Sequence, residues 1–251
     1  MNENRFDSKG EVYAESRPNY PDDFINYLYS EVGMTENSVI ADVGSGTGIL
    51  TKPLLQKGSK VYAVEPNDDM RRMAERNLQH FDGFTSVCGT AENTEIPAGS
   101  VDFVVVGQAY HWFDRSLFQN ECRRILKPSG KILLVWNFRD EKSAIISENA
   151  VVNKRYCPNF NGYTEGMTEM ENDAEFTQFF VGDYKSKVFE NSVSYDEIRF
   201  VGRNLSSSYA PIVTDDNYVP YIDALKELFS KFSENGVLIY PYLTRSYIGS
   251  V

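Results

Sequence analysis

The chain has 251 residues, of which 41% are hydrophobic and 14% aromatic. This suits one α/β domain with insertions, or a domain plus a cap, around a full core. The net charge is −11 at pH 7, and no cluster of lysine or arginine offsets that field, so a nucleic acid is not an expected partner.

The cysteine count and the first ten residues indicate in which cellular compartment the protein is expected. Three cysteines are odd in number and far apart, which favours a reduced compartment over a disulfide framework or a zinc site. The first ten residues are polar, so no signal peptide is expected. No apolar run reaches the roughly 18 residues of a membrane span. We therefore expect a cytoplasmic protein with no membrane partner and no metal.

The first segment is a polar arm followed by a helix. Residues 6–20 are mostly polar, and Arg17 precedes Pro18, which biases Arg17 away from helix. A helix begins at Pro21 and ends at Gly33. Two interpretations of the arm remain open: a surface arm packed on the domain, or a lid whose Arg17 pairs with a ligand carboxylate.

The central feature of the sequence is S-V-I-A-D-V-G-S-G-T-G at residues 38–48. Its apolar, β-branched first half predicts a buried parallel strand. Gly44, Gly46 and Gly48 then permit a sharp turn that a ligand can approach closely. A helix is predicted over 48–57, in which Pro53 would delete one backbone hydrogen bond. Strand, glycine turn and helix N-terminus form a nucleotide-type cradle, although a tight turn without a ligand is the alternative.

The glycine spacing narrows the ligand. The third glycine comes one residue earlier than in a dinucleotide fingerprint, and Ile49 occupies the expected position. No Gly-Lys-Ser/Thr follows, so the turn is not a phosphate P-loop. The second predicted strand, 60–64, ends in Glu65, which follows Gly44 by 21 positions. A nucleotide-binding βαβ unit places its ribose carboxylate at about this offset.

The alternation of strands and helices continues to residue 136. Asn67 and Asp114 are predicted helix N-caps. Five strands in about 100 residues indicate a doubly wound parallel sheet with right-handed crossovers. Ligands of such sheets lie beyond the carboxyl ends of the strands. The further strands are predicted over 84–88, 101–106 and 131–136, and the strand ends carry Gly44, Glu65, Thr90 and Gln108.

The pattern loosens after the fifth strand. Residues 138–183 are irregular and are interpreted as a cap over the ligand crevice, with helices at 145–154 and 171–180. Strands at 185–193 and 237–247 complete a mostly parallel, doubly wound seven-stranded sheet with a helical cap insertion. Helices are predicted at 195–205 and 216–232. We divide the chain into an arm and first helix (1–33), a cofactor-binding core (34–137), a cap and substrate insertion (138–184) and a sheet-completing segment (185–251).

Several motifs together resemble one family. D-V-G-S-G-T-G, V-Y-A-V-E-P-N, G-T-A-E-N-T-E-I-P-A-G-S-V-D-F-V-V-V and I-L-K-P-S-G-K-I-L are similar to motifs of the class I S-adenosylmethionine (SAM)-dependent methyltransferases, type 11-like. The resemblance covers about Tyr13 to Trp136 and implies the Rossmann-like methyltransferase fold. Y-A-E-S-R-P-N-Y-P and Q-A-Y-H-W-F resemble a subgroup that includes trans-aconitate methyltransferase-like proteins of small-molecule metabolism.

The resemblance also implies a role for each matching residue. The glycine turn holds the methionyl part of SAM with support from Asp42, and Glu65 binds the ribose. The N–H of Ala91 meets the adenine, and Gln108 lies near the transferring methyl. Thr90 stands where the family usually has Asp, so Glu92 is the substitute for that adenine contact. The implied cofactor-binding residues are Tyr13, Arg17, Asp42, Gly44, Ser45, Gly46, Glu65, Pro66, Thr90, Ala91, Glu92 and Gln108.

The expected function is methyl transfer from SAM to a small-molecule acceptor by in-line displacement. A general base is needed only if the acceptor must lose a proton, and His111 is the candidate because it follows the fourth strand. The alternative role for His111 is structural, fixing the turn at Trp112 and Phe113. Two other functions remain open: a nicotinamide-dependent oxidoreductase, and a non-catalytic SAM-binding module. The acceptor and the oligomeric state are not predicted.

Overall fold

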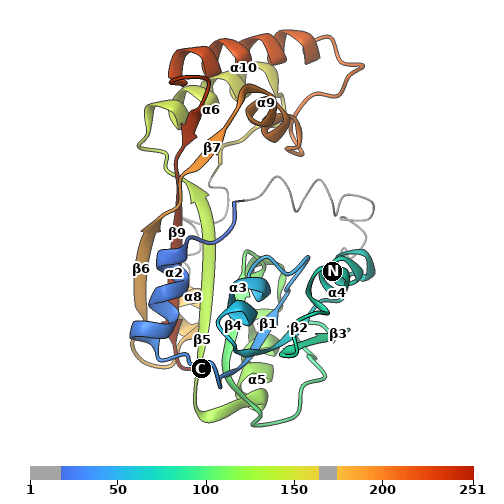
Figure 1. Ribbon diagram of the computed structural model, residues 1–251, viewed down its shortest axis with the longest axis vertical. Helices are drawn as coiled ribbons and strands as arrows, with labels where there is room; N and C mark the ends of the chain where they lie inside the picture. The colour runs from blue at the N-terminus through green and yellow to red at the C-terminus, as the bar shows by residue number, and fades with distance from the viewer. Residues whose placement is uncertain (1–17, 164–173) are drawn as a thin grey trace.

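A seven-stranded sheet organises the computed structural model, which describes residues 18–163 and 174–251 (Figure 1). The strand order is β3-β2-β1-β4-β5-β9-β6. The first five strands run parallel, and β9 runs antiparallel to both its neighbours. The predicted doubly wound, mostly parallel sheet is therefore confirmed. Its strands are β1 (Val39–Val43), β2 (Lys60–Val64), β3 (Phe84–Val87), β4 (Val101–Gly107), β5 (Leu126–Arg139), β6 (Lys185–Glu190) and β9 (Tyr242–Gly249).

Helices cover both faces of this sheet because its central strands are apolar on both sides. Val104 and Val105 of β4 are fully buried in two different clusters, one on each face. The helices formed by residues 22–78 pack on one face, and α5 and α8 pack on the other. These helices are α2 (Asp22–Tyr27), the π-helical η2 (Leu28–Val32), α3 (Thr51–Gln56), α4 (Asp68–Leu78), α5 (Arg115–Ile125) and α8 (Ala174–Phe179).

Pro53 fits its helix better than the sequence suggests. The residues after the glycine turn form turns, and α3 begins only at Thr51. Pro53 therefore lies in the first turn of α3, where backbone N–H groups have no partner within the helix. The expected loss of a hydrogen bond does not arise, because the helix is shorter than predicted.

A separate apolar core, apart from the two clusters of the sheet, lies beyond the carboxyl end of β5, in the cap at the top of Figure 1. The cap differs from the expected division at residue 184. Helices α9 and α10 come from the segment expected to complete the sheet, yet they pack with α6, whereas α8 packs against the sheet. The elements of the cap are α6 (Ala144–Tyr156), β7 (Val193–Tyr195), α9 (Glu197–Leu205), α10 (Tyr218–Phe232) and β8 (Leu238–Tyr240).

Pro241 separates the cap from the sheet. The predicted strand over 237–247 is two strands: β8, which pairs with β7 in the cap, and β9, which pairs with β5 and β6. Proline lacks a backbone donor and interrupts a sheet ladder. The last strand of the sheet therefore returns directly from the cap. In the part of the chain that the structure describes, every helix falls short of the length and hydrophobicity that crossing a bilayer requires.

Candidate cofactor-binding site

The glycine turn lies against the end of the neighbouring strand β2. The N–H groups of Gly44 and Ser45 donate to the carbonyl oxygen of Val64 at 2.9 and 3.1 Å. Gly44 has a φ of +71°, and a Cβ there would lie 2.7 Å from the Cβ of Ala109. Both the left-handed backbone and this close approach exclude a side chain. The turn is therefore fixed against β2 and packed against the segment after β4.

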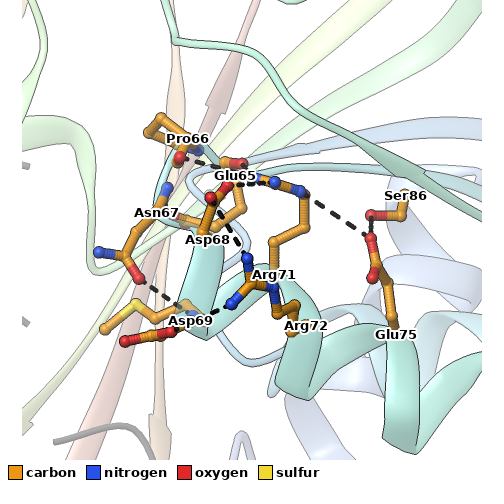
Figure 2. Close-up of polar contacts among 10 residues, drawn as sticks. Glu65, Pro66, Asn67, Asp68, Asp69, Arg71, Arg72, Glu75 and Ser86 are labelled. Atoms are coloured by element: carbon orange, nitrogen blue, oxygen red, sulfur yellow. Dashed lines mark hydrogen bonds and ion pairs between the residues drawn. The ribbon is translucent and has the colours of Figure 1, made fainter. Parts of the chain in front are cut away.

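The Glu65 carboxylate bonds the glycine turn from the end of β2. Figure 2 shows Glu65 beside the start of α4. Its Oε2 accepts the N–H of Gly46 at 2.8 Å, and its Oε1 accepts the N–H of Asn67 at 2.9 Å. The side chain is buried, with 7% of Glu65 exposed. Burial raises its pKa, although these two hydrogen bonds and the charge of Arg71 act in the opposite direction. Each carboxylate oxygen keeps a lone pair for a further donor.

Arg71 of α4 holds the backbone that carries Glu65. Its Nη1 donates to the carbonyl oxygens of Glu65 and Pro66 at 3.1 and 3.4 Å. The same guanidinium pairs with Asp68, one turn earlier in α4 (Figure 2). Pro66 thus lies beside the carboxylate, and the first turn of α4 fixes the end of β2.

Asp42 lies behind the turn and is fully enclosed. It is 1% exposed, and its Oδ2 accepts the hydroxyl of Thr51 at 2.6 Å. Burial raises the pKa of Asp42 to about 7, against the lowering effect of that hydrogen bond, and the negative charge of Glu65 raises it further. The bond connects β1 to the first residue of α3 across the turn.

The glycine turn also holds polar atoms without partners. The hydroxyl oxygens of Ser45 and Thr47 are shielded from solvent and make no hydrogen bond within the protein. Buried polar groups are normally satisfied, so these two hydroxyls and the Glu65 carboxylate fit a ligand that carries several polar groups. The residues of the turn therefore fit the sugar and amino-acid parts of SAM.

The residues expected around the adenine are already engaged with the protein. The Oγ of Thr90 accepts the N–H of Asn93 at 3.2 Å and closes a short turn. Glu92 Oε1 accepts the N–H of Asp114 at 2.9 Å and connects this loop to the start of α5. Ala91, between them, is buried at 4% exposure. The loop is thus held in a defined shape, with Glu92 as a connection to the next helix.

Gln108 and His111 follow the end of β4. Gln108 has a φ of +61°, and its Nε2 donates to the carbonyl oxygen of Asn137 at 2.9 Å. His111 lies in the short helix η3 (Tyr110–Trp112), where its side chain is exposed and its ring centre lies 4.8 Å from that of Trp112. Tyr110 anchors η3 because its ring is fully buried.

The structure thus brings Asp42, Gly44, Ser45, Gly46 and Glu65 to one bend. Tyr13 and Arg17 lie outside the described residues.

The fold also places Tyr20 and Met70 beside glycines of the site. A Cβ at Gly107 would overlap the hydroxyl of Tyr20, and one at Gly46 would lie 3.8 Å from the Sδ of Met70. In the sequence, Tyr20 belongs to the polar arm, and Met70 lies at a helical spacing that allows either a contact with adenine or a place in the core.

Comparisons with known proteins match the region that contains the glycine turn. A family model for a methyltransferase domain matches residues 41–134. An uncharacterized methyltransferase of Mycobacterium tuberculosis (strain H37Rv) is 36% identical over 143 residues, which are 57% of this chain and 56% of that protein. One from Schizosaccharomyces pombe is 33% identical over 129 residues, 51% of this chain and 50% of that protein. The chain spans about half the length of the curated relatives it matches.

Solved structures show the same fold over nearly the whole chain. A protein described as a type II methyltransferase from Anaeromyxobacter dehalogenans superposes with a TM-score of 0.67 at 21% identity, covering 93% of this chain and 97% of that one. The YcgJ protein from Bacillus subtilis gives a TM-score of 0.55 at 17% identity, covering 92% and 100%. Residues 41–134 thus match a methyltransferase domain, and these solved structures share the fold of the chain.

Proposed function

We propose that this protein is a SAM-dependent methyltransferase that acts on a small-molecule acceptor in the cytoplasm. One observation carries the proposal: the Glu65 carboxylate accepts the N–H of Gly46 inside the glycine turn. An acid at this distance from the turn can bind a ribose. The third glycine comes one residue earlier than in the fingerprint that binds a dinucleotide pyrophosphate, and this spacing disfavours the nicotinamide-dependent alternative.

The proposed roles follow the positions of the side chains. Gly44, Ser45 and Gly46 hold the methionyl part of SAM, and Glu65 accepts hydrogen bonds from the ribose hydroxyls. The backbone N–H of Ala91 contacts the adenine. When bound, SAM supplies a methyl group already activated by a sulfonium. Since the leaving group needs no help, the main task of the protein is to hold donor and acceptor in line, which can contribute about 7–11 kcal/mol.

His111 is the proposed general base for an acceptor that must lose a proton. Its exposed side chain lies three residues beyond Gln108, past the carboxyl end of β4. The buried ring of Tyr110 anchors η3 independently of the His111 side chain. We expect His111→Ala to leave SAM affinity unchanged and to lower turnover at least tenfold. Full turnover by the variant, measured with labelled SAM and an identified acceptor, would remove the base role.

Calorimetry tests the proposed function directly. We expect the protein to bind SAM and not NAD. Replacement Glu65→Gln should weaken SAM binding by about 10- to 150-fold, because a charge-assisted hydrogen bond contributes about 1.5–3 kcal/mol. Glu75→Gln is the matched control, since Glu75 lies on α4, bonds Ser86 and lies 3.9 Å from Arg71, with no bond to the turn.

Three results decide between the candidate functions. Tight NAD binding without SAM binding would overturn the methyltransferase in favour of the oxidoreductase. Equal SAM affinity in Glu65→Gln and Glu75→Gln would remove the ribose role. Labelled-SAM turnover with a panel of metabolites separates an enzyme from a non-catalytic SAM-binding module.

A further inference from the structure

A group of arginines and tyrosines lies where the cap joins the sheet. Arg139 is the last residue of β5 and pairs in register with Tyr242, the first residue of β9. Arg203 reaches the same place from α9, because its charge acts on the Tyr242 hydroxyl together with that of Arg139. We call the following residues the arginine–tyrosine cluster: Arg139, Arg203, Tyr163, Tyr195, Tyr240 and Tyr242.

Among the described residues, aromatic rings rather than carboxylates surround the Arg139 guanidinium. Its central carbon lies 4.1 Å from the ring centre of Tyr163 and 5.8 Å from that of Tyr242. Such contacts attract a cation, yet they bring no negative charge. Among the ion pairs of residues 18–163 and 174–251, none includes Arg139 or Arg203.

Three nitrogen donors in and beside the cluster have no hydrogen-bond partner among the described residues. They are shielded from solvent. Asn149 shows the pattern clearly: its Oδ1 accepts the hydroxyl of Tyr240 at 2.7 Å, while its Nδ2 has no acceptor. The three donors are Arg139 Nε, Arg203 Nε and Asn149 Nδ2. They need acceptors, and an oxyanion supplies several.

The electrostatics agree with a site for an anion. Burial by itself raises the pKa of Tyr242, but the charges of Arg203 and Arg139, together with hydrogen bonds to Arg203 and Tyr195, outweigh burial and lower it. Both arginines are partly buried, and partly buried cations that form no ion pair among the described residues are unfavourable in a folded protein. Such an arrangement is typical of a functional site that a negatively charged ligand completes.

The cluster also lies near the proposed methyl-transfer site. Gln108 Nε2 donates to the carbonyl oxygen of Asn137, and Arg139 follows Asn137 by two residues on β5. Residues two apart on a strand lie about 7 Å apart along it. The guanidinium of Arg139 is therefore within the reach of a small acceptor molecule whose other end lies beside Gln108. Figure 1 shows β5 running from the sheet to the base of the cap.

We propose that the arginine–tyrosine cluster binds an oxyanion, carboxylate or phosphate, of the methyl acceptor. This inference rests on the proposed methyltransferase function and adds the chemical class of the acceptor. Pairing with guanidinium groups stabilises an oxyanion and makes it a poor nucleophile. The oxyanion is therefore the anchor, and the methyl group goes to another atom of the acceptor, nearer to Gln108.

Simple aromatic probes test the site without knowledge of the acceptor. Benzoate and phenyl phosphate each carry one oxyanion on a ring that can pack against the tyrosines, and benzamide is the neutral isostere of benzoate. We expect calorimetry with the full chain to show binding of benzoate, phenyl phosphate or both, and at least tenfold weaker binding of benzamide. The stronger of the two anions identifies the acceptor group. Equal binding of benzoate and benzamide, or no binding of either anion, overturns the proposal.

Variants connect the binding to the cluster. Arg139→Gln and Arg203→Gln should each weaken the better anion at least tenfold. Arg199→Gln should leave it unchanged, because Arg199 is an exposed residue of α9 that pairs with Asp196. Tyr242→Phe, which removes only a hydroxyl, provides a second variant that preserves packing and should weaken the anion by a smaller factor. Unchanged anion affinity in Arg139→Gln and Tyr242→Phe refutes the assignment.

SAM calorimetry on the same samples separates the two proposals. If the protein binds the anion through Arg139 but does not bind SAM, the oxyanion site stands, but its role as an acceptor site is refuted. SAM binding without anion binding would remove only the oxyanion site. We expect Arg139→Gln to bind SAM with the affinity of the unchanged protein, which also shows that the variant is folded.

Discussion

Two carboxyl groups share the glycine turn, and their surroundings give them different properties. Glu65 accepts two backbone N–H groups, one of them from the turn itself. Asp42 has one hydroxyl partner and no solvent contact. Its pKa of about 7 means that near neutral pH its charge is readily lost. Asp42 therefore makes the stability of the turn depend on pH, independently of any ligand.

The sign of this dependence follows from the raised pKa. The unfolded chain has the ordinary Asp pKa of about 4, so the folded protein holds an extra proton between about pH 4 and pH 7. The free energy of unfolding therefore falls as pH rises through this range, by up to about 4 kcal/mol for a shift of this size. Below pH 4 this loss in the free energy of unfolding is absent, and above pH 7 it is complete.

Asp42→Asn removes this penalty and keeps an oxygen that can accept from Thr51. We expect its stability advantage over the unchanged protein to be near zero at pH 4 and to reach about 2–4 kcal/mol at pH 8. Urea unfolding at both pH values measures it. Asp69→Asn, at an exposed position on α4, is the control and should show no such change. A pH-independent difference for Asp42→Asn would contradict the assignment.

At the scale of one element, the connection from β1 to α3 depends on close packing as much as on backbone freedom. Gly44 and Gly99 have similar positive φ values, +71° and +61°. A Cβ at Gly44 would meet Ala109 and Phe113, whereas nothing lies within 4 Å of one at Gly99. Substitution of the two glycines therefore separates the cost of the backbone conformation from the cost of the contact.

We expect Gly99→Ala to destabilise the protein by about 1 kcal/mol, because only the left-handed conformation resists it. Gly44→Ala should cost a further 1–3 kcal/mol or so from overpacking. Urea unfolding measures both. The double variant Gly44→Ala with Ala109→Gly should recover part of the extra loss. Equal losses for the two single variants would show that the contact with Ala109 is easily relieved.

At the scale of the whole molecule, the chain has separate apolar cores in the sheet and in the cap. Leu225 of α10 is fully buried in the cap, and Leu54 of α3 is fully buried beside the sheet. These cores are built from different segments and meet where β5 and β9 leave the sheet. The cap can therefore loosen without opening the glycine turn.

Leu225→Ala should destabilise the cap by about 2–5 kcal/mol through loss of buried methyl groups. We expect hydrogen exchange to speed up in α6, α9 and α10 and to stay unchanged in α4 and α5. SAM affinity should be retained. Leu54→Ala, the matched variant in the sheet, should show the opposite distribution. Uniform loss of protection in both variants would mean that the two cores unfold as one unit.

The cofactor half of the molecule was predictable because its contacts are local in the sequence. Each strand, turn and helix follows the last, and a parallel βαβ unit brings Glu65 back to Gly46 with no information from elsewhere in the chain. Asn67 and Asp114 cap α4 and α5 as predicted, each accepting a backbone N–H. The elements after residue 137 were found approximately, and two late strands were expected to complete the sheet, but the partners of the cap helices were not predicted.

Which elements of the cap pack together depends on contacts between residues far apart in the sequence. The hydrophobic periodicity of each segment does not encode these contacts. The alternation over 237–247 predicted one strand, and only Pro241 hinted at a break. Which side of that break joins the sheet is decided by its neighbours: β9 pairs with β5 and β6, and β8 pairs with β7. The packing of α8 against the sheet likewise depends on the rings of Tyr110 and Phe118.

The sequence by itself determined the sheet, the glycine turn and the acid that faces it, because these follow from residues close together along the chain. The spacing of the glycines predicted the class of cofactor that we propose. Only the tertiary structure brought Arg139, Arg203 and Tyr242 together in the site that we propose. They come from three distant segments, and the antiparallel return of β9 from the cap is what sets them side by side.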